Sequence, residues 1–400
     1  MTAMVIIGAG HAAGQAAASL RQEKYEGEII IFGDEPYIPY QRPPLSKQYF
    51  SGEMELEKVY LRPEKFYSDR NITLNIGVRI ESIDPSAKTV TDTDGNTTSY
   101  EKLLIATGSR PRILDIEGSD LEGLHYLRTI ADVDSIRAEM GEGKKVVIVG
   151  GGYIGLEVAA VCASSLMEVH VLEMEERILQ RVTTRAMSEY YHNLHTSRGV
   201  NIHTATMVTG FRGDGRVRQV LCGDEVLDAD LVVIGIGILP NTEIAEAAEL
   251  ACDNGIVVDD HCRTSNPDIY AAGDCTNHPN ALLNRRLRLE SVPNAMEQAR
   301  VACANICGGD KTYASVPWFW SDQYELKLQM VGFSADGNTE IVRGSKADNQ
   351  FAVFYLSDGK LVAADAVNSP KEFVLCRQLV GKPVDASVLE DPDSDLNSPL

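Results

Sequence analysis

Residues 145–157 read Lys-Val-Val-Ile-Val-Gly-Gly-Gly-Tyr-Ile-Gly-Leu-Glu, an apolar run that leads into a Gly150-x-Gly152-x-x-Gly155 pattern. A related stretch opens the chain, where an apolar run over 4–7 precedes Gly8-x-Gly10-x-x-Ala13. In such a pattern the first glycine makes a strand-to-helix turn, the second lets the backbone approach a pyrophosphate, and the third small residue lets the helix pack on the strand. The N-terminus of the helix then faces the phosphate charge. Each stretch therefore predicts a dinucleotide-binding strand–turn–helix unit.

Each unit continues into a second apolar strand that ends in an acid, as this kind of unit requires. The acid is Asp34 after the strand 28–33, and Glu173 after the strand 169–172. Two complete units imply two nucleotide cofactors, with electrons passing from one to the other. The stretch Arg42–Lys47, which follows the first unit, has no cysteine, and the first cysteine of the chain is Cys162. A redox-active disulfide is therefore not available there, and the electrons must leave the protein by another route.

Composition narrows the class of protein. The 400 residues are 44% hydrophobic and 24% charged, as in ordinary globular chains of two or three domains. The net charge of −21 argues against nucleic acid and anionic membranes as partners. No segment is long and apolar enough to cross a bilayer. The eight cysteines form no C-x-x-C pair and the histidines are scattered, so no metal site is expected, and free thiols in this number suit the cytoplasm.

The order of segments indicates a nested α/β architecture. The strand and small-residue turn Leu103–Gly108 have a counterpart in Ile269–Asp274, and the second nucleotide unit lies between them. At Asp274 we expect a strand-to-helix turn in which the carboxylate accepts backbone N–H groups. We predict an FAD-binding domain in two segments, an NAD-binding domain inserted into it, and a C-terminal α+β domain: residues 1–112 and 243–313, residues 113–242, and residues 314–400.

The C-terminal domain shows alternating strand-like and helical patterns. A strand over 350–356 turns at 357–360, and a helix is expected from about Pro370 to Val380, with Gly381 as its stop. The tail beyond Lys382 carries five acids and no basic residue. We expect a solvated end there.

With these elements in place, the chain resembles the two-dinucleotide flavoprotein disulfide-reductase superfamily, whose fold is that of glutathione reductase. Within it, the chain is similar to the FAD-dependent, NADH-oxidising reductases that serve ferredoxins or rubredoxins in bacterial oxygenase systems. The resemblance covers essentially the whole chain. The motifs that carry it are Pro39-Tyr40-x-Arg42-Pro43-Pro44-Leu45-Ser46-Lys47, Ala106-Thr107-Gly108, Gly150–Glu157, Thr264-Ser265-x-Pro267-x-Ile269–Asp274, Glu290–Ala295 and Pro317–Tyr324.

The resemblance implies roles for individual residues. Lys47 is expected near the redox edge of the flavin and paired with Glu157, and Trp320 is expected to border the flavin or nicotinamide site. These three residues are the catalytic candidates, although Lys47 and Glu157 would each be plausible as ordinary surface and helix-start residues. The cofactor-binding set that the resemblance implies is Gly8, Gly10, Ala12, Ala13, Asp34, Arg42, Pro44, Lys47, Ile80, Ala106, Thr107, Gly108, Arg128, Gly150, Gly152, Tyr153, Ile154, Gly155, Glu157, Glu173, Gly237, Gly273, Asp274, Val292 and Trp320.

Within that set, Asp34 is implied to hold the adenosine ribose of FAD, and Asp274 to approach its ribityl or phosphate region. Glu173 is placed to accept hydrogen bonds from both ribose hydroxyls of NADH and to repel the 2′-phosphate of NADPH. Arg177 lies four residues further on, and an arginine there could bind the 2′-phosphate, so NADPH is kept as an alternative cofactor.

The implied activity is a ferredoxin reductase that moves a hydride from NADH to FAD and then releases electrons singly, in aromatic hydrocarbon catabolism for example. The partner is a small [2Fe–2S] ferredoxin, or a rubredoxin, that feeds a Rieske oxygenase or a cytochrome P450. Such carriers are usually acidic, so a local basic face must steer them. For Arg285, Arg286 and Arg288 the alternative is a solvated run of charges with no docking role. The alternatives are a rubredoxin reductase, an NADH oxidase of the same superfamily, or a flavin-holding redox sensor. The docking candidates are Arg62, Arg285, Arg286, Arg288 and Arg300.

Overall fold

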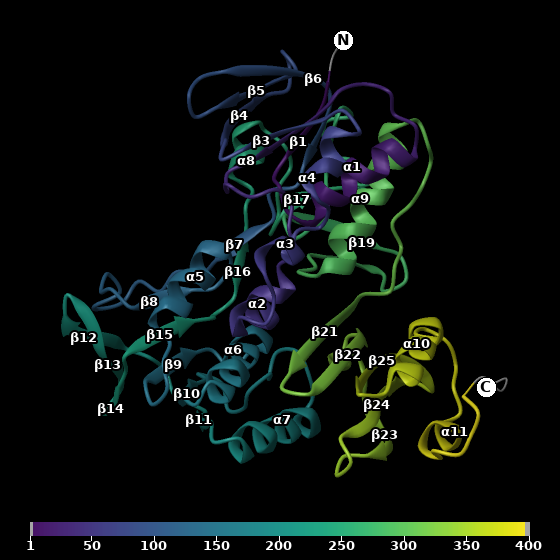
Figure 1. The fold of residues 1–400 in the computed structure, drawn as a ribbon. Coiled ribbons are helices and arrows are strands. Elements are labelled where there is room, and N and C mark those ends of the chain that lie inside the picture. Colours follow the sequence, from purple (N-terminus) through teal and green to yellow (C-terminus); the bar gives the residue numbers. More distant parts are fainter. Residues whose placement is uncertain (1–2, 397–400) are drawn as a thin grey trace. The chain divides into compact units, whose positions relative to one another are not determined.

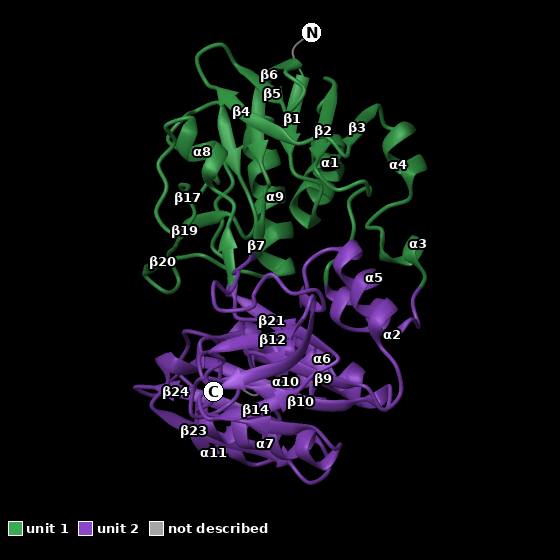
Figure 2. Ribbon diagram, turned by 90° about the vertical axis from the view of Figure 1, so that its left-hand side faces the viewer, with its two compact units in different colours: residues 1–42, 55–110, 238–315 green, residues 43–54, 111–237, 316–400 purple. Residues whose placement is uncertain are grey.

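The computed structural model describes residues 3–396 and divides into two compact units, drawn in Figures 1 and 2. Unit 1 holds the residues up to 42, 55–110 and 238–315, and unit 2 holds 43–54, 111–237 and those from 316 onward. Unit 1 overlaps the two segments predicted to bind FAD, and unit 2 combines most of the predicted NAD-binding and C-terminal domains in one compact unit. One segment differs, because the structure groups residues 43–54, which contain Lys47, with unit 2.

Unit 1 is built on a sheet in the order β3-β2-β1-β6-β5-β4, with β18 also paired to β6. β6 is long, so that its first half pairs antiparallel with β5 and its second half pairs parallel with β1 and β18. A parallel sheet must be covered on both faces. Alanines let α1 and α9 pack closely together over one face, where both helices are seen in Figure 1. The elements are β1 (Ala3–Ile7), α1 (His11–Gln22), β2 (Ile29–Gly33), α3 (Leu56–Val59), α4 (Glu64–Ser68), β3 (Ile72–Ile76), β4 (Ile80–Asp84), β5 (Thr89–Asp92), β6 (Thr97–Ile105), β7 (Ser109–Pro111), β16 (Ile238–Pro240), α8 (Glu243–Ala247), β17 (Ile256–Val257), β18 (Ile269–Ala271), β19 (Thr276–Asn280), β20 (Arg285–Leu287) and α9 (Val292–Ile306).

Unit 2 contains a second parallel sheet, in the order β11-β10-β9-β15-β8. Its central strands β9 and β15 are apolar runs buried on both faces, which is why they read as continuous rather than alternating patterns. A three-stranded antiparallel sheet, β12-β13-β14, packs its apolar residues with this sheet in one core cluster. The elements are η1 (Pro43–Ser46), α2 (Gln48–Ser51), β8 (Leu124–Tyr126), α5 (Ile130–Glu139), β9 (Lys145–Val149), α6 (Tyr153–Ser164), β10 (Glu168–Leu172), α7 (Arg185–Ser197), β11 (Asn201–His203), β12 (Gly210–Asp214), β13 (Arg216–Cys222), β14 (Glu225–Asp228) and β15 (Leu231–Ile234).

The C-terminal part of unit 2 is an antiparallel sheet in the order β21-β22-β25-β24-β23, with α10 packed on β22 and β25. The predicted hairpin and helix are confirmed, since β24 turns into β25 at Asp358 and Gly359 and α10 is followed by Gly381 at φ +86°. The elements are β21 (Trp318–Gln323), β22 (Leu326–Gly332), η2 (Ser334–Asp336), β23 (Thr339–Ser345), β24 (Gln350–Ser357), β25 (Lys360–Val367), α10 (Pro370–Leu379) and α11 (Ala386–Glu390).

The prediction of a purely solvated acidic tail is wrong in part. The acidic side chains are exposed, but the segment forms α11, and Leu389 is fully buried against the C-terminal core. Arg343, only 7% exposed, donates hydrogen bonds to backbone carbonyls of Val388, Pro392 and Ser394. The buried guanidinium satisfies carbonyls that would otherwise lack partners, so it fixes the tail on the sheet.

Candidate active site

The first glycine-rich turn leaves room at the start of α1. Gly8 has φ +111°, and a Cβ there would lie 2.2 Å from the carbonyl oxygen of Ala106, so only glycine fits. Gly10 is the N-cap of α1, no side chain in the described chain caps this helix, and a Cβ on Gly10 would meet nothing within 4 Å. Ala12 and Ala13 follow as buried residues of the first turn. An uncapped helix N-terminus that faces open space fits a pyrophosphate.

The second turn has the same construction. Gly150 has φ +113° and its Cβ would lie 2.4 Å from the Gly235 carbonyl oxygen, while a Cβ on Gly155 would lie 2.1 Å from the Gly150 carbonyl oxygen. Gly152 is the N-cap of α6, and a Cβ there again would meet nothing within 4 Å. The close helix-to-strand packing predicted from the third glycine is therefore present, and the residues fit a second dinucleotide.

In unit 1 the turn Ala106–Gly108 is held against Asn241. Thr107 donates to the Asn241 carbonyl at 2.8 Å, and the Asn241 amide donates to the Thr107 carbonyl at 2.9 Å. Gly273 has φ +93° and its N–H donates to Gln298 Oε1 at 2.8 Å.

The expected strand-to-helix turn at Asp274 is wrong. The next element is the strand β19, because Thr276 closes a tight turn on the Gly273 carbonyl and the chain continues as a hairpin. Asp274 accepts the Ser109 hydroxyl at 2.8 Å. The carboxylate is therefore oriented by a side chain of a neighbouring strand and not by a helix start.

A charged cluster follows β2. Asp34 is exposed at the end of the strand, and Glu35 pairs with Arg42 at 2.8 Å. Tyr40 donates to Glu35 at 2.6 Å and accepts from Arg42 at 2.8 Å. This triangle fixes the chain just before the two prolines Pro43 and Pro44. The sequence did not single out Glu35, although its position next to Asp34 was a signal.

In unit 2, Lys47 and Glu157 form the predicted pair. Lys47 Nζ lies 2.6 Å from Glu157 Oε2, and the side chains are 10% and 3% exposed. The Ser46 hydroxyl donates to the same oxygen at 2.5 Å, and the Ser321 hydroxyl donates to Glu157 Oε1 at 2.6 Å. A buried ion pair is tolerated only when further hydrogen bonds satisfy it, which these serines provide. Neither serine was predicted; both lie in quoted motifs, but nothing in one sequence shows that Ser321 meets α6.

An aromatic row lies in unit 2 where α6 meets β21. The ring of Tyr153, the first residue of α6, is 5.3 Å from that of Phe319, and its hydroxyl contacts Met330 Sδ at 2.6 Å. Trp318 and Trp320 share a face of β21, as predicted, with ring centroids 5.7 Å apart. Trp318 also packs on Phe373 in the C-terminal core, so Trp320 is the tryptophan left for a cofactor role.

Glu173 is fixed by backbone groups of unit 2. Its Oε2 accepts the Gly151 N–H at 2.8 Å and its Oε1 accepts the Glu175 N–H at 2.9 Å. Arg177 donates to Ser188 Oγ at 2.6 Å and to two backbone carbonyls of the loop before α7. The guanidinium is therefore committed to its own loop.

The remaining predicted cofactor residues are dispersed over both units. Ile80 is buried in the unit 1 core, so only its backbone is available to a ligand. Val292 begins α9 behind the Ser291 cap, and Ile154 is 45% exposed in the first turn of α6. In unit 2, Arg128 precedes α5, and Gly237 has φ +105° with open space at its Cβ position.

The five docking candidates differ in availability. Arg286 donates to the Val258 carbonyl at 2.8 Å and to Asn277, and Arg288 pairs with Glu290 at 2.5 Å. Arg286 thus holds the β19–β20 hairpin, while Arg288 bonds Glu290 and Asn254 outside it. Arg62, Arg285, Arg286 and Arg300 are exposed on unit 1, and Arg288 is partly buried.

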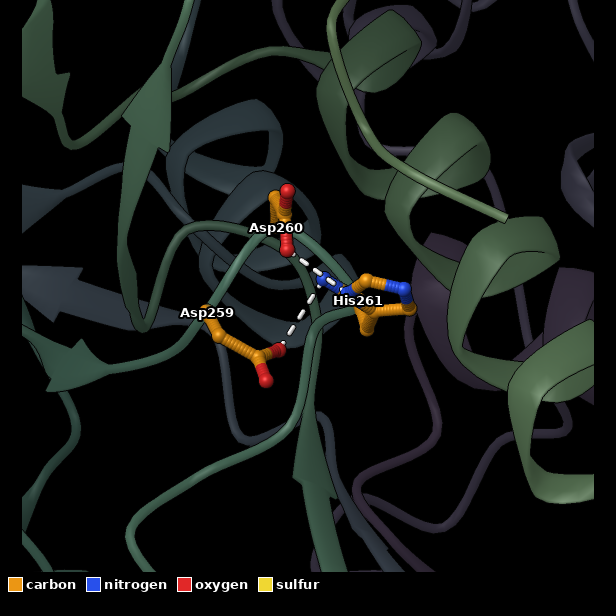
Figure 3. Close-up of side chains that lie close together, drawn as sticks. All are labelled: Asp259, Asp260 and His261. Atoms are coloured by element: carbon orange, nitrogen blue, oxygen red, sulfur yellow. Dashed lines mark hydrogen bonds and ion pairs between the residues drawn. The ribbon is translucent and has the colours of Figure 1, made fainter. Parts of the chain in front are cut away.

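Among residues 3–396, one group of side chains lies close enough to hold a metal ion, Asp259, Asp260 and His261 (Figure 3). Asp259 accepts the backbone N–H of His261 at 2.9 Å, and the ring of His261 bonds Asp260 at 2.6 Å and Asp310 at 2.8 Å. These bonds raise the pKa of His261, with Asp310 the first cause and Asp260 the second. The group is an exposed loop closure whose charges already satisfy one another.

Comparisons with known proteins identify the family. The family model described as pyridine nucleotide-disulphide oxidoreductase matches residues 2–299, and the one described as reductase C-terminal matches 318–400. The chain belongs to this oxidoreductase family. It is 44% identical to a ferredoxin–NAD(P)+ reductase of Sphingomonas sp. (94% of this chain, 92% of that one) and 43% identical to putidaredoxin reductase of Pseudomonas putida (97% and 94%). The solved structure of a covalent putidaredoxin reductase–putidaredoxin complex matches with TM-score 0.94 and 43% identity, over 98% of this chain and 96% of that one.

Two further expectations concern the cysteines and membrane-spanning helices. All eight cysteines lie in the described range and are free thiols, as predicted. No helix among residues 3–396 is long and apolar enough to cross a membrane.

Proposed function

We propose that the chain is an NADH-dependent, FAD-containing ferredoxin reductase that passes electrons singly to a small [2Fe–2S] ferredoxin, which in turn feeds a Rieske oxygenase or a cytochrome P450. The two relatives named above support this, since each aligns with at least 94% of the chain. When bound, FAD supplies the conversion between two-electron and one-electron chemistry. The free thiols support a cytoplasmic location.

The observation that carries the proposal is the buried Lys47–Glu157 pair in a segment without cysteine. A disulfide reductase needs a thiol pair beside its flavin, and the chain offers a lysine instead. A buried ammonium stabilises negative charge that develops next to it, and its fixed partner keeps it oriented. This arrangement supports a flavin that is reduced by a nicotinamide and then discharged to an external carrier.

The proposal assigns the first turn to FAD and the second to NADH. At the second turn, Glu173 presents a carboxylate held by two backbone N–H groups where an adenosine ribose would lie. Arg177, the residue that could have favoured a 2′-phosphate, donates to Ser188 and backbone carbonyls. The negative charge therefore dominates at this strand end, which favours NADH over NADPH.

The carrier would dock on the arginines that the fold leaves exposed. Arg62, Arg285, Arg286 and Arg300 are exposed on unit 1, and the guanidinium of Arg286 also bonds Val258 and Asn277, whereas Arg288 is partly buried and pairs with Glu290. In a chain of net charge −21, such positions offer an acidic ferredoxin a local attraction within the range of about 8 Å over which charges act at physiological salt.

The test is NADH-driven reduction of a carrier panel by the FAD-loaded protein. A [2Fe–2S] ferredoxin, a rubredoxin and dissolved oxygen are compared at equal concentration, with ferricyanide as the artificial acceptor. Fast reduction of the ferredoxin is expected. Preference for rubredoxin would reassign the partner, and efficient transfer to oxygen alone would make the chain an NADH oxidase. A flavin that NADH does not bleach would point to a redox sensor.

A further inference from the structure

Beyond the ion pair, Glu157 is the end of a longer chain of hydrogen bonds inside unit 2. The chain connects α6, β21 and α7, and α6 lies beside β21 (Figure 1). Ser321 Oγ, which donates to Glu157, accepts from Gln323 Nε2 at 3.1 Å. Gln323 Oε1 lies 2.8 Å from His195 Nε2, and His195 Nδ1 lies 3.3 Å from the Tyr324 hydroxyl.

This chain of hydrogen bonds is buried over most of its length. Ser321, Gln323 and His195 are each 0% exposed, and Tyr324 is the first member that reaches the surface. His195 lies on the buried face of α7 together with Tyr191, one turn earlier. An apolar residue would suit such a position, so a histidine there needs partners.

Every hydrogen bond in this series is donated in the same direction, from Tyr324 toward Glu157. Because the Gln323 amide donates to Ser321, its carbonyl faces His195, and the neutral ring must carry its hydrogen on Nε2. Nδ1 is then an acceptor for the Tyr324 hydroxyl. Since Ser321 receives a hydrogen from Gln323, its own hydrogen is directed to Glu157 Oε1. Burial lowers the pKa of His195 to about 4, so the ring stays neutral at working pH.

We propose that His195 is a positioning residue that acts on Glu157 through Gln323 and Ser321, and so holds the carboxylate in the orientation that presents Lys47. The proposal rests on the function proposed above, in which the Lys47–Glu157 pair serves flavin reduction. The Nε2–H of His195 bonds the carbonyl of the Gln323 amide, so the two groups hold each other in this orientation. Without that constraint the amide is free to turn over, and Ser321 is no longer directed at the carboxylate. Glu157 would then keep its bonds from Ser46 and Lys47 and lose the one that fixes its other oxygen.

The first test does not depend on the flavin. In protein labelled with ¹⁵N-histidine, the resonance that disappears in His195→Gln identifies the residue. The expected signal is a neutral ring with hydrogen on Nε2 and no titration between pH 8 and 5. In Gln323→Met this tautomer should no longer dominate. A ring that titrates near its ordinary pKa, about 6.5, or that carries its hydrogen on Nδ1, would overturn the proposal.

The second test asks whether His195 works through Glu157. In FAD-loaded protein, His195→Leu is expected to slow flavin reduction by saturating NADH about tenfold, by analogy with the loss of a hydrogen-bond partner of a metal ligand. His195→Gln keeps an N–H in reach of Gln323 and should recover most of that rate. In a Glu157→Gln background, His195→Leu should cause no further slowing. An equal slowing in both backgrounds would show a merely structural role and reject the proposal.

Ser321→Ala provides the same cycle if His195→Leu does not fold, because it removes the donor to Glu157 with little change in volume. Failure of this proposal is distinguishable from failure of the proposed function. If Glu157→Gln slows flavin reduction but His195→Leu does not, only the role of His195 is lost. If the wild-type protein reduces no iron–sulfur carrier, the proposed function is lost, while the histidine tautomer still reports on the hydrogen-bond chain.

Discussion

Gly33 packs so closely on Ala9 that a Cβ on Gly33 would lie 2.5 Å from the Cβ of Ala9. The strand register shows which residue of the second nucleotide unit occupies the position of Gly33. Ile7 pairs with Phe32 in unit 1 as Val149 pairs with Leu172 in unit 2, so Gly33 and Glu173 are equivalent positions. In unit 2 the residue opposite is Gly151, which leaves room for the glutamate and donates its N–H to it. The alanine of unit 1 thus explains why its acid, Asp34, comes one residue later.

This packing predicts that Gly33→Ala destabilises the protein by about 1–3 kcal/mol, the usual cost of overpacking. Ala9→Gly in the same chain should recover most of the loss, because it removes the clashing methyl group. Urea unfolding of the three proteins measures the effect. An unchanged midpoint for Gly33→Ala would contradict the packing argument.

Lys47→Ala should slow flavin reduction by NADH in stopped-flow measurements by about 100-fold, comparable to the loss of one preorganised donor at a developing charge. It should also cost about 3–5 kcal/mol of stability, since it leaves Glu157 buried without its cation. Lys47→Ala combined with Glu157→Gln should restore stability but not the rate. An unchanged reduction rate would remove Lys47 from the mechanism.

Glu173→Gln should reduce the preference for NADH over NADPH, as a ratio of kcat/KM values, by about tenfold or more, because like charges in contact cost several kcal/mol. Arg177→Met is the matched control. It should lower stability by disturbing the loop before α7 and leave the cofactor ratio as it was. A wild-type preference for NADPH, or loss of NADPH use in Arg177→Met alone, would contradict the assignment.

Charge reversal at Arg285 or Arg300 should weaken reduction of the ferredoxin, mainly through the association rate, and should do so more at low salt. Reduction of ferricyanide should fall less. Arg212→Glu, an exposed change on β12 of unit 2, serves as the control for net charge. Equal loss with both acceptors would mean that these arginines do not meet the carrier.

Asp365 gives the stability of the protein a specific pH dependence. Burial raises the pKa of this carboxyl to about 6, against the hydrogen bonds from Thr183 and Tyr355 that lower it. The folded protein therefore holds this proton more tightly than the unfolded chain, so the contribution of Asp365 to stability is complete below about pH 4 and is lost as pH rises through 6. Asp365→Asn should lack this loss.

The variant should gain up to about 3 kcal/mol over the wild type between pH 4 and 6, and nothing further above. The measurement is urea unfolding of both proteins at a series of pH values. Asp224→Asn, at an exposed hairpin turn, controls for the removal of one charge. A constant difference between the Asp365 variant and the wild type across that range would refute the prediction.

Many elements of this fold could be predicted from residues that are adjacent in the sequence. The two glycine patterns, their strands and helices, the nested order of segments and the C-terminal hairpin depend on neighbours in the chain, and the structure has all of them. The pairing of Lys47 with Glu157 was within reach only because long motifs resemble a known family. Asp274 was misplaced because a strand followed by a small-residue turn is the same local signal whether a helix or a second strand comes next.

The sequence alone determined that this chain holds two nucleotide units and that the segment Arg42–Lys47 after the first unit has no cysteine. Residue type, φ and packing volume at the turns are local properties. Tertiary structure alone decided that Ser321 and Ser46 meet at one carboxylate and that His195 is linked to it through Gln323. It also decided that Arg177 serves its own loop and that Arg343 fixes the acidic tail. These contacts join residues that lie from 3 to 164 positions apart. A hydrogen bond depends on where the fold places both partners, and neither residue carries that information in its own neighbourhood.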